Sequence, residues 1–236
     1  MNKRRISLII PVYNDLPALK RAIPETFQFM SSFDSDFELI IAEDASTDGS
    51  AAYAASWEKN DKRVRHLHRD ERLGRGSALS AAAREATGNI FCYFDVDLAT
   101  DLNHLSDLIK AIESGMDVAT GSRLLPDSDI TRSINREIKS RGYNWLVRFF
   151  LRSKLQDHQC GFKAFKREVL LSLLPEIQDT HWFWDTEVLI RAQKRGYCVS
   201  EIPVLWREGP GTTVKTQDIW KMGRAILRLW WNLHVS

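Results

Sequence analysis

Two carboxylates separated by one residue, Asp95 and Asp97, are the side chains whose type and spacing point most directly to chemistry. They follow a short apolar run at 89–94, which predicts a buried strand. Residues i and i+2 of an extended chain point to the same side, so the two carboxylates repel each other unless a cation joins them. Oxygen ligands at an open site suit Mg²⁺ or Mn²⁺. The alternative is a solvated turn whose carboxylates cap the following helix.

A metal held in this way would carry a diphosphate and neutralise charge on a departing nucleotide.

Two further motifs are suited to a nucleotide. The acidic run at 43–50 offers Glu43 and Asp44 to a base or a ribose, although Asp48 and its neighbours are also good helix N-caps. Gly74 and Arg75 precede a predicted helix, whose N-terminus favours phosphate. The spacing matches neither the dinucleotide fingerprint nor the P-loop, which excludes a Rossmann dehydrogenase and a P-loop NTPase.

The elements that must position these residues alternate between strand and helix. Apolar runs predict buried strands at 6–12, 37–42, 64–67, 89–94 and 118–120. Helical patterns lie between and after them at 16–30, 50–60, 79–86 and 105–114. This alternation predicts an α/β fold with a mostly parallel sheet and helices on both faces. Ligands of such sheets bind beyond the carboxyl ends of the strands, which is where each acidic cluster stands.

Composition narrows the class of protein. The 236 residues suffice for one large α/β domain, and a formal net charge of +2 argues against a general nucleic-acid binder. The three cysteines are odd in number and far apart, which favours a reducing compartment over disulfides or a zinc cage. No uninterrupted apolar stretch is long enough to span a membrane, so we expect any membrane contact to be peripheral.

Taken in order, the motifs at 9–14, 43–50 and 95–97 resemble glycosyltransferase family 2, the inverting enzymes of the GT-A fold. The segments at 121–123, 157–163, 184–187 and 206–212 look like the polyprenyl- and dolichyl-phosphate glycosyltransferases, and most of all like the dolichyl-phosphate β-glucosyltransferases. The resemblance covers nearly the whole chain. It implies a UDP- or GDP-sugar donor, a divalent metal and a lipid phosphate acceptor.

Carried over residue by residue, the resemblance implies that Asp95 and Asp97 hold the metal and the diphosphate, and that Asp157 lies by the reacting centre. Arg123 would meet phosphate. Three positions depart from the family pattern: Asp15 replaces a common glutamate, Glu43 begins an altered Asp-Asp-Gly motif, and Ala99 stands where some mannose-transferring relatives have another metal ligand. The donor site is expected to comprise Pro11, Tyr13, Asp15, Glu43, Asp44, Gly74, Arg75, Asp95 and Asp97.

A phosphate monoester has its second pKa near ~6, so it is largely an anion at neutral pH and needs no strong general base. Arginines that position this phosphate should therefore contribute more to the reaction than a general base does. Arg123 and Arg136 are the expected acceptor-phosphate ligands, with Arg132 and Arg141 as further candidates; the alternative is a solvated basic face. Asp157 and Arg123 are the expected catalytic pair, although Asp157 could also serve only as an ion-pair partner.

The chain is predicted to divide into a catalytic domain at 1–212 and an amphipathic helix at 213–236. One helical face of the tail carries Ile219, Met222, Ile226, Leu229 and Leu233, with Trp220, Trp230 and Trp231 beside it. This composition is typical of an interfacial helix. The alternatives are a helix packed on the protein itself and a dimer contact. A second aromatic, basic segment lies at 143–151. We expect a peripheral protein on the cytoplasmic side of a membrane, with a membrane protein or a second copy as a further partner.

The predicted reaction is therefore transfer of a hexose, with UDP-glucose as the first donor and GDP-mannose as the second, to a lipid phosphate. Another family 2 reaction, on a polysaccharide or a small-molecule hydroxyl, would need a carboxylate base. A nucleotidyltransferase would usually carry a glycine-rich basic loop after its first strand, where this chain has Pro11 to Asn14. A non-catalytic binding module is disfavoured by the intact carboxylates.

Overall fold

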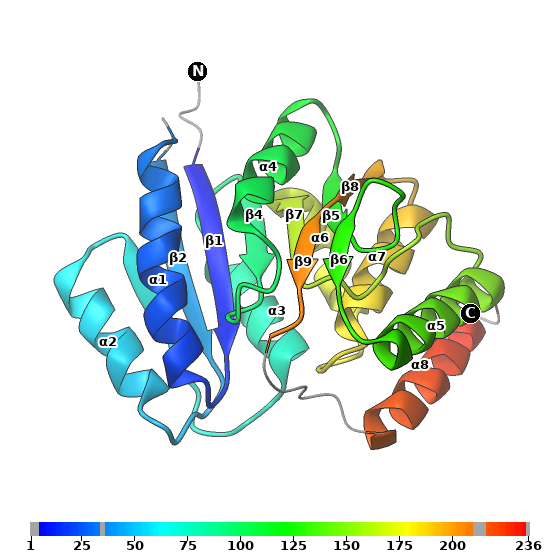
Figure 1. The fold of residues 1–236 in the computed structure, drawn as a ribbon, viewed down its shortest axis with the longest axis horizontal. Helices are drawn as coiled ribbons and strands as arrows, with labels where there is room; N and C mark the ends of the chain where they lie inside the picture. Colours follow the sequence, from blue (N-terminus) through cyan, green and yellow to red (C-terminus); the bar gives the residue numbers. More distant parts are fainter. Residues whose placement is uncertain (1–4, 34–35, 210–215, 235–236) are drawn as a thin grey trace.

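The central element of the molecule is a seven-stranded sheet (Figure 1). The computed structural model describes residues 5–33, 36–209 and 216–234, the last with side chains from 221 onwards. The strand order is β3-β2-β1-β4-β7-β5-β8. The bounds are β1 (Arg5–Val12), β2 (Asp36–Glu43), β3 (Val64–Leu67), β4 (Ile90–Phe94), β5 (Val118–Ser122), β7 (Phe162–Lys166) and β8 (Val199–Pro203).

Five of the strands form where the apolar runs predict them, and β1, β2 and β4 pair in parallel with almost wholly buried side chains. Strand β7 is the exception in direction: it runs antiparallel to both β4 and β5. Its first residue, Phe162, therefore pairs with the last residue of β4, Phe94. This register brings the segment before β7 to the carboxyl edge of the parallel strands.

Helices cover both faces of the sheet, which confirms the predicted α/β class. One core packs α1 (Leu16–Ser31), α2 (Ser50–Asn60) and α4 (Leu105–Glu113) against the sheet. The other packs α3 (Arg75–Glu85), α6 (Arg167–Leu173) and α7 (Trp184–Lys194). The short pieces η1 (Leu102–His104) and η2 (Leu174–Glu176) adjoin α4 and α6, and a two-stranded sheet joins β6 (Asp129–Thr131) to β9 (Leu205–Arg207).

The C-terminal helix α8 (Thr216–His234) lies beside α5 (Ile134–Leu151), away from α1 and α2 (Figure 1). The predicted apolar stripe of the tail is largely covered: Met222, Ile226 and Leu229 are buried against α5 and α7. This is the alternative in which the tail packs on the protein itself. The side chains of Ile219 and Trp220, and the predicted boundary between 212 and 213, lie outside the described residues.

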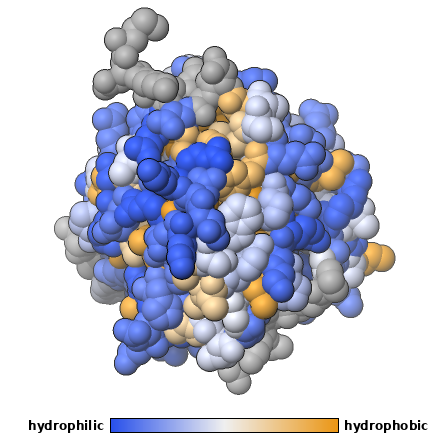
Figure 2. Space-filling view, turned by 90° about the vertical axis from the view of Figure 1, so that its left-hand side faces the viewer, coloured by the Kyte–Doolittle hydropathy of each residue, from blue (hydrophilic) through white to orange (hydrophobic). Residues whose placement is uncertain are grey.

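Exposed aromatic side chains remain on the outer surface of α5 and α8. We call this the aromatic surface; it comprises Ile134, Ile138, Trp145, Leu146, Phe149, Leu227, Trp230 and Trp231. The opposite end of the molecule, formed by α1 and α2, is mostly hydrophilic (Figure 2). Within the described ranges, no helix combines the length and the apolar character that crossing a bilayer requires.

Candidate active site

The predicted carboxylate pair lies in the turn directly after β4. Asp97 is exposed and its Oδ1 accepts a hydrogen bond from the Ala99 amide at 3.0 Å, whereas the Asp95 side chain is 43% exposed. Burial raises the pKa of Asp95, and the neighbouring charges of Asp97 and Asp185 raise it further against the opposing effect of Arg75. Because the Asp97 charge disfavours ionisation of Asp95, the pair is better suited to a cation than to solvent alone.

A partly buried ion-pair network fixes the orientation of Asp95. Arg75, the first residue of α3, donates from Nη2 and Nε to Asp95 Oδ1 at 2.7 and 3.1 Å, and from Nη1 to Asp185 Oδ2 at 2.5 Å. Lys163 Nζ lies 2.9 Å from Asp185 Oδ1, which also accepts a hydrogen bond from the Tyr93 hydroxyl. Arg75 therefore holds a predicted metal ligand instead of pointing freely at phosphate.

Sequence analysis missed Asp185, Lys163 and Tyr93 as parts of this site. Burial opposes ionisation of Asp185, but Arg75 and Lys163 outweigh it and hold the pKa of Asp185 below its usual range. The available signal was Lys163, a lysine between the apolar residues Phe162 and Ala164. A fully buried lysine needs a charged partner.

The segment before β7 closes the other side of the site. Gly161 O accepts a hydrogen bond from Asp95 N at 3.0 Å, and a Cβ atom on Gly161 would lie 2.0 Å from Asp95 Oδ2. Glycine is therefore required for the Asp95 carboxylate to occupy this position. Oxygen donors on Asp95 and Asp97, with like-charge repulsion between them, fit Mg²⁺ or Mn²⁺. The donor atoms of these two residues are thus of the kind that the predicted metal binds.

Asp157 and Arg123 form a bidentate ion pair close enough to Asp95 for its charge to act on Arg123. Arg123 Nε and Nη2 lie 2.7 and 3.0 Å from the two oxygens of Asp157, and the Arg123 amide donates to Asp157 Oδ2 at 3.0 Å. Asp157 is fully buried. Burial alone would raise its pKa, but Arg123 outweighs this and holds the pKa of Asp157 well below its usual range. The pair is permanently ionised at neutral pH, so Asp157 cannot act there as a general acid.

Trp206 brings the two expected phosphate ligands together. The Arg123 guanidinium lies 5.8 Å from its ring centroid and the Arg136 guanidinium 5.3 Å. Arg136 Nη1 also lies 2.8 Å from Glu208 Oε1. The other two candidates, Arg132 and Arg141, both pair with Glu137. The charges of these three arginines are therefore partly neutralised by Glu137 and Glu208.

The loops after β1 and β2 form the expected nucleotide side. Pro11 is buried, and Tyr13 is exposed with Arg72 stacked 3.7 Å from its ring centroid. Asp15 caps α1 by accepting a hydrogen bond from Ala18 N at 3.2 Å. Asn14 Oδ1 accepts a hydrogen bond from Thr47 N at 2.7 Å and so ties the two loops together. Among the residues expected on the nucleotide side, Tyr13 is thus the one with an exposed aromatic ring.

Asp44 and Glu43 are both almost fully buried. Asp44 accepts hydrogen bonds from the amides of Leu73 and Gly74 at 3.0 and 2.8 Å, so it positions the loop that carries Arg75. Three non-glycine residues in the loops after β1, β2 and β4, namely Asn14, Ala45 and Leu98, have positive φ. Such backbone strain is concentrated at functional sites. Each of the three follows a different strand, and the three strands are adjacent.

The chain is similar to a family of known proteins. Residues 7–174 match the model of "Glycosyl transferase family 2". The chain is 47% identical over 234 residues to glycosyltransferase AglD of Haloferax volcanii, an alignment that covers 98% of this chain and 38% of that protein. It therefore spans about two fifths of that relative. It is 28% identical over 241 residues to a dolichyl-phosphate beta-glucosyltransferase of Drosophila melanogaster, covering 95% and 74% of the two chains.

Solved structures share the fold. The complex of Mycobacterium tuberculosis glucosyl-3-phosphoglycerate synthase with Mn²⁺, UDP and glucosyl-3-phosphoglycerate has a TM-score of 0.71 at 18% identity, covering 97% of this chain and 79% of that one. A complex of the same enzyme contains Mg²⁺ and UDP. The predicted fold is confirmed, and these structural neighbours bind a divalent metal together with a nucleotide.

Proposed function

The chain belongs to glycosyl transferase family 2, and on that premise we propose that it moves a hexose from a nucleotide-sugar to a polyprenyl or dolichyl phosphate, with inversion at the anomeric carbon. UDP-glucose is the first donor and GDP-mannose the second. The observation that carries the proposal is the meeting of two pairs at one sheet edge: the carboxylates Asp95 and Asp97, and the ion pair of Arg123 with Asp157.

On the donor side, Asp95 and Asp97 would hold Mg²⁺ or Mn²⁺, which when bound supplies Lewis-acid neutralisation of the leaving diphosphate. Arg75 keeps Asp95 in place through two hydrogen bonds. Tyr13, exposed at the end of β1, is placed to stack on a nucleobase. The dolichyl-phosphate glucosyltransferase relatives and the neighbours with bound UDP support glucose and UDP.

On the acceptor side, Arg123 would place the incoming phosphate. Its pair with Asp157 uses Nε and Nη2, so Nη1 lies outside that pair. Arg132 adds a second donor: its side chain is 3% exposed and its Nη2 has no hydrogen-bond partner among the described residues. A buried unsatisfied donor favours an anion. A phosphate oxygen is already anionic at neutral pH, so the ionised Asp157 need not remove a proton.

The aromatic surface of α5 and α8 would bring the site to its lipid substrate. The same two helices carry the exposed cations Arg141, Lys221 and Arg228. Tryptophan with arginine is typical of an interfacial contact with anionic lipid. We place the protein peripherally on the cytoplasmic side, which fits three free cysteines, two of them buried. A membrane protein or a second copy of the chain would be a further partner of this surface.

The proposal is tested by incubating the protein and polyprenyl phosphate with a panel of radiolabelled nucleotide-sugars, with and without EDTA. We expect label in the lipid phase from one donor, abolished by EDTA and by Asp97→Ala. Label from GDP-mannose alone would replace glucose with mannose. Label that appears only on a polysaccharide or on a small hydroxyl compound, or that stays on every donor, would overturn the lipid phosphate as acceptor.

A further inference from the structure

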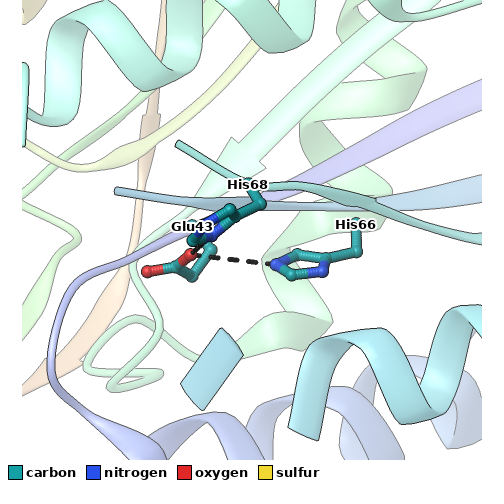
Figure 3. Close-up of side chains that lie close together, drawn as sticks. All are labelled: Glu43, His66 and His68. Carbon is teal, nitrogen blue, oxygen red and sulfur yellow. Dashed lines mark hydrogen bonds and ion pairs between the residues drawn. The ribbon is translucent and has the colours of Figure 1, made fainter. Parts of the chain in front are cut away.

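Two histidines and a glutamate meet at the β3 edge of the sheet (Figure 3). Glu43 is the last residue of β2, His66 lies in β3, and His68 follows β3 directly. Histidines two apart on an extended chain point to the same side. Their ring centroids are 5.8 Å apart. The three ligand atoms all lie within 4.8 Å of one another.

One carboxylate oxygen faces both imidazoles. Glu43 Oε2 lies 2.5 Å from His68 Nδ1 and 3.8 Å from His66 Nε2, while Glu43 Oε1 accepts a hydrogen bond from the Ser46 amide. The backbone bond to Oε1 fixes the carboxylate, so that Oε2 stays aimed at the two rings. The Glu43 side chain has no exposure to solvent.

His66 supplies an independent indication of a ligand. Its side chain is 8% exposed, and its Nε2 has no hydrogen-bond partner among the described residues. A buried ring nitrogen left without a partner is unfavourable unless something coordinates it. His68, in contrast, is 47% exposed, so the position between the rings remains open to solvent for entry of an ion and for a bound water.

We propose that Glu43, His66 and His68 form a binding site for Zn²⁺ or a similar transition cation, distinct from the Mg²⁺ or Mn²⁺ site. Two imidazoles and one carboxylate are a zinc donor set, whereas Mg²⁺ prefers oxygen alone. Tetrahedral zinc with bonds of roughly 2.0–2.1 Å places its ligand atoms about 3.3 Å apart. The observed 2.5 and 3.8 Å lie on either side of that value, so shifts of less than about 1 Å in the exposed His68 and in His66 complete the geometry.

Competition with a chromogenic zinc chelator measures the site directly. The protein is used without a histidine tag, in an Asp97→Ala background and with millimolar Mg²⁺, so that the carboxylate pair does not contribute. We expect one Zn²⁺ per chain. We also expect His66→Ala and His68→Ala each to weaken binding at least tenfold, since even indirect supports of a metal site are worth about 10–100-fold. His234→Ala, which changes an exposed histidine of α8, is the matched control and should bind as the parent does.

A second measurement separates loss of the site from loss of folding. Zinc should raise the Tm of the parent and of His234→Ala, and should not raise that of His66→Gln, whose circular dichroism shows that it is folded. Failure of the parent to bind one equivalent, or binding unchanged in the variant lacking both His66 and His68, overturns the proposal. The readout is independent of sugar transfer, so it can fail while the proposed function stands.

Discussion

The substitution Gly161→Ala displaces the Asp95 carboxylate selectively, because it adds one methyl group and removes no functional atom. The new Cβ would lie 2.0 Å from Asp95 Oδ2 and 2.4 Å from its Cγ. The backbone cannot easily yield: Gly161 O binds Asp95 N at 3.0 Å, and the adjacent residue Phe162 pairs with Phe94. The Asp95 carboxylate must therefore rotate away.

Rotation separates Asp95 from Arg75 and breaks two charged hydrogen bonds. Because the Asp95 side chain is 43% exposed, water replaces part of what is lost. We therefore expect the free energy of unfolding to fall by about 1–3 kcal/mol. The effect on transfer should be larger. Displacing a group by ~1 Å costs about 100-fold in rate.

The assay measures label transfer to polyprenyl phosphate, and thermal unfolding under the same conditions. Gly142→Ala is the matched control, because a Cβ at Gly142 in α5 meets nothing within 4 Å. It should keep its activity and gain up to about 1 kcal/mol of stability. Transfer by Gly161→Ala within about threefold of the parent would refute the argument that Asp95 must occupy its observed position.

Three further predictions concern other parts of the molecule. Burial lowers the pKa of His158 to about 4, against an ordinary value near ~6.5; urea unfolding should therefore show about 3 kcal/mol lost as the pH falls from ~6.5 to ~4, and much less in His158→Gln. Arg123→Lys should lower kcat/KM for transfer at least about 100-fold, because lysine cannot hold both Asp157 and a phosphate in a planar fork. Trp145→Ser combined with Phe149→Ser should weaken flotation with anionic vesicles at least about tenfold, since each exposed ring would bury apolar area in lipid.

Each of these predictions has an outcome that contradicts it. A pH dependence of unfolding that is identical with and without His158 would mean that this histidine charges freely in the folded protein. Near-normal transfer by Arg123→Lys would leave the guanidinium with a purely structural role. Unchanged flotation of the double variant, alongside Lys59→Ser on α2 as the control, would remove the aromatic surface from membrane binding.

The parallel half of the fold was predictable because its signal is local. Strands β1, β2 and β4 are mostly apolar runs, and helix α1 begins at the predicted Leu16 and ends one residue later than predicted. Helix α3 begins earlier than predicted, at Arg75, because Gly74 in a positive-φ conformation starts it. Strands β7 and β8 were not predicted. Both are short, Lys163 interrupts the apolar pattern of β7, and the antiparallel pairing of β7 and the parallel pairing of β8 are set by partners distant in the sequence.

In the candidate site, too, residues with a local sequence signal were predictable, and contacts between distant segments were not. Asp95, Asp97 and Glu43 could be identified as candidates because they lie at or directly after the ends of buried strands. The spacing of residues in the sequence does not predict contacts between distant segments. Examples are the ion pair of Arg75 with Asp185, 110 residues apart, and the contacts of Arg123 and Arg136 with the Trp206 ring. The tail helix shows what helical periodicity of apolar residues cannot predict. Its apolar stripe predicts a buried face without saying whether lipid or protein covers it.

The most direct test of the central claim is calorimetric titration of UDP into the protein with Mn²⁺ and with EDTA, for the parent and for Asp97→Asn. The account predicts tight binding only with Mn²⁺ in the parent, and weak, metal-independent binding in the variant, which keeps its size and loses its charge. Equal affinity of the parent in Mn²⁺ and in EDTA, or full metal dependence in Asp97→Asn, would contradict it.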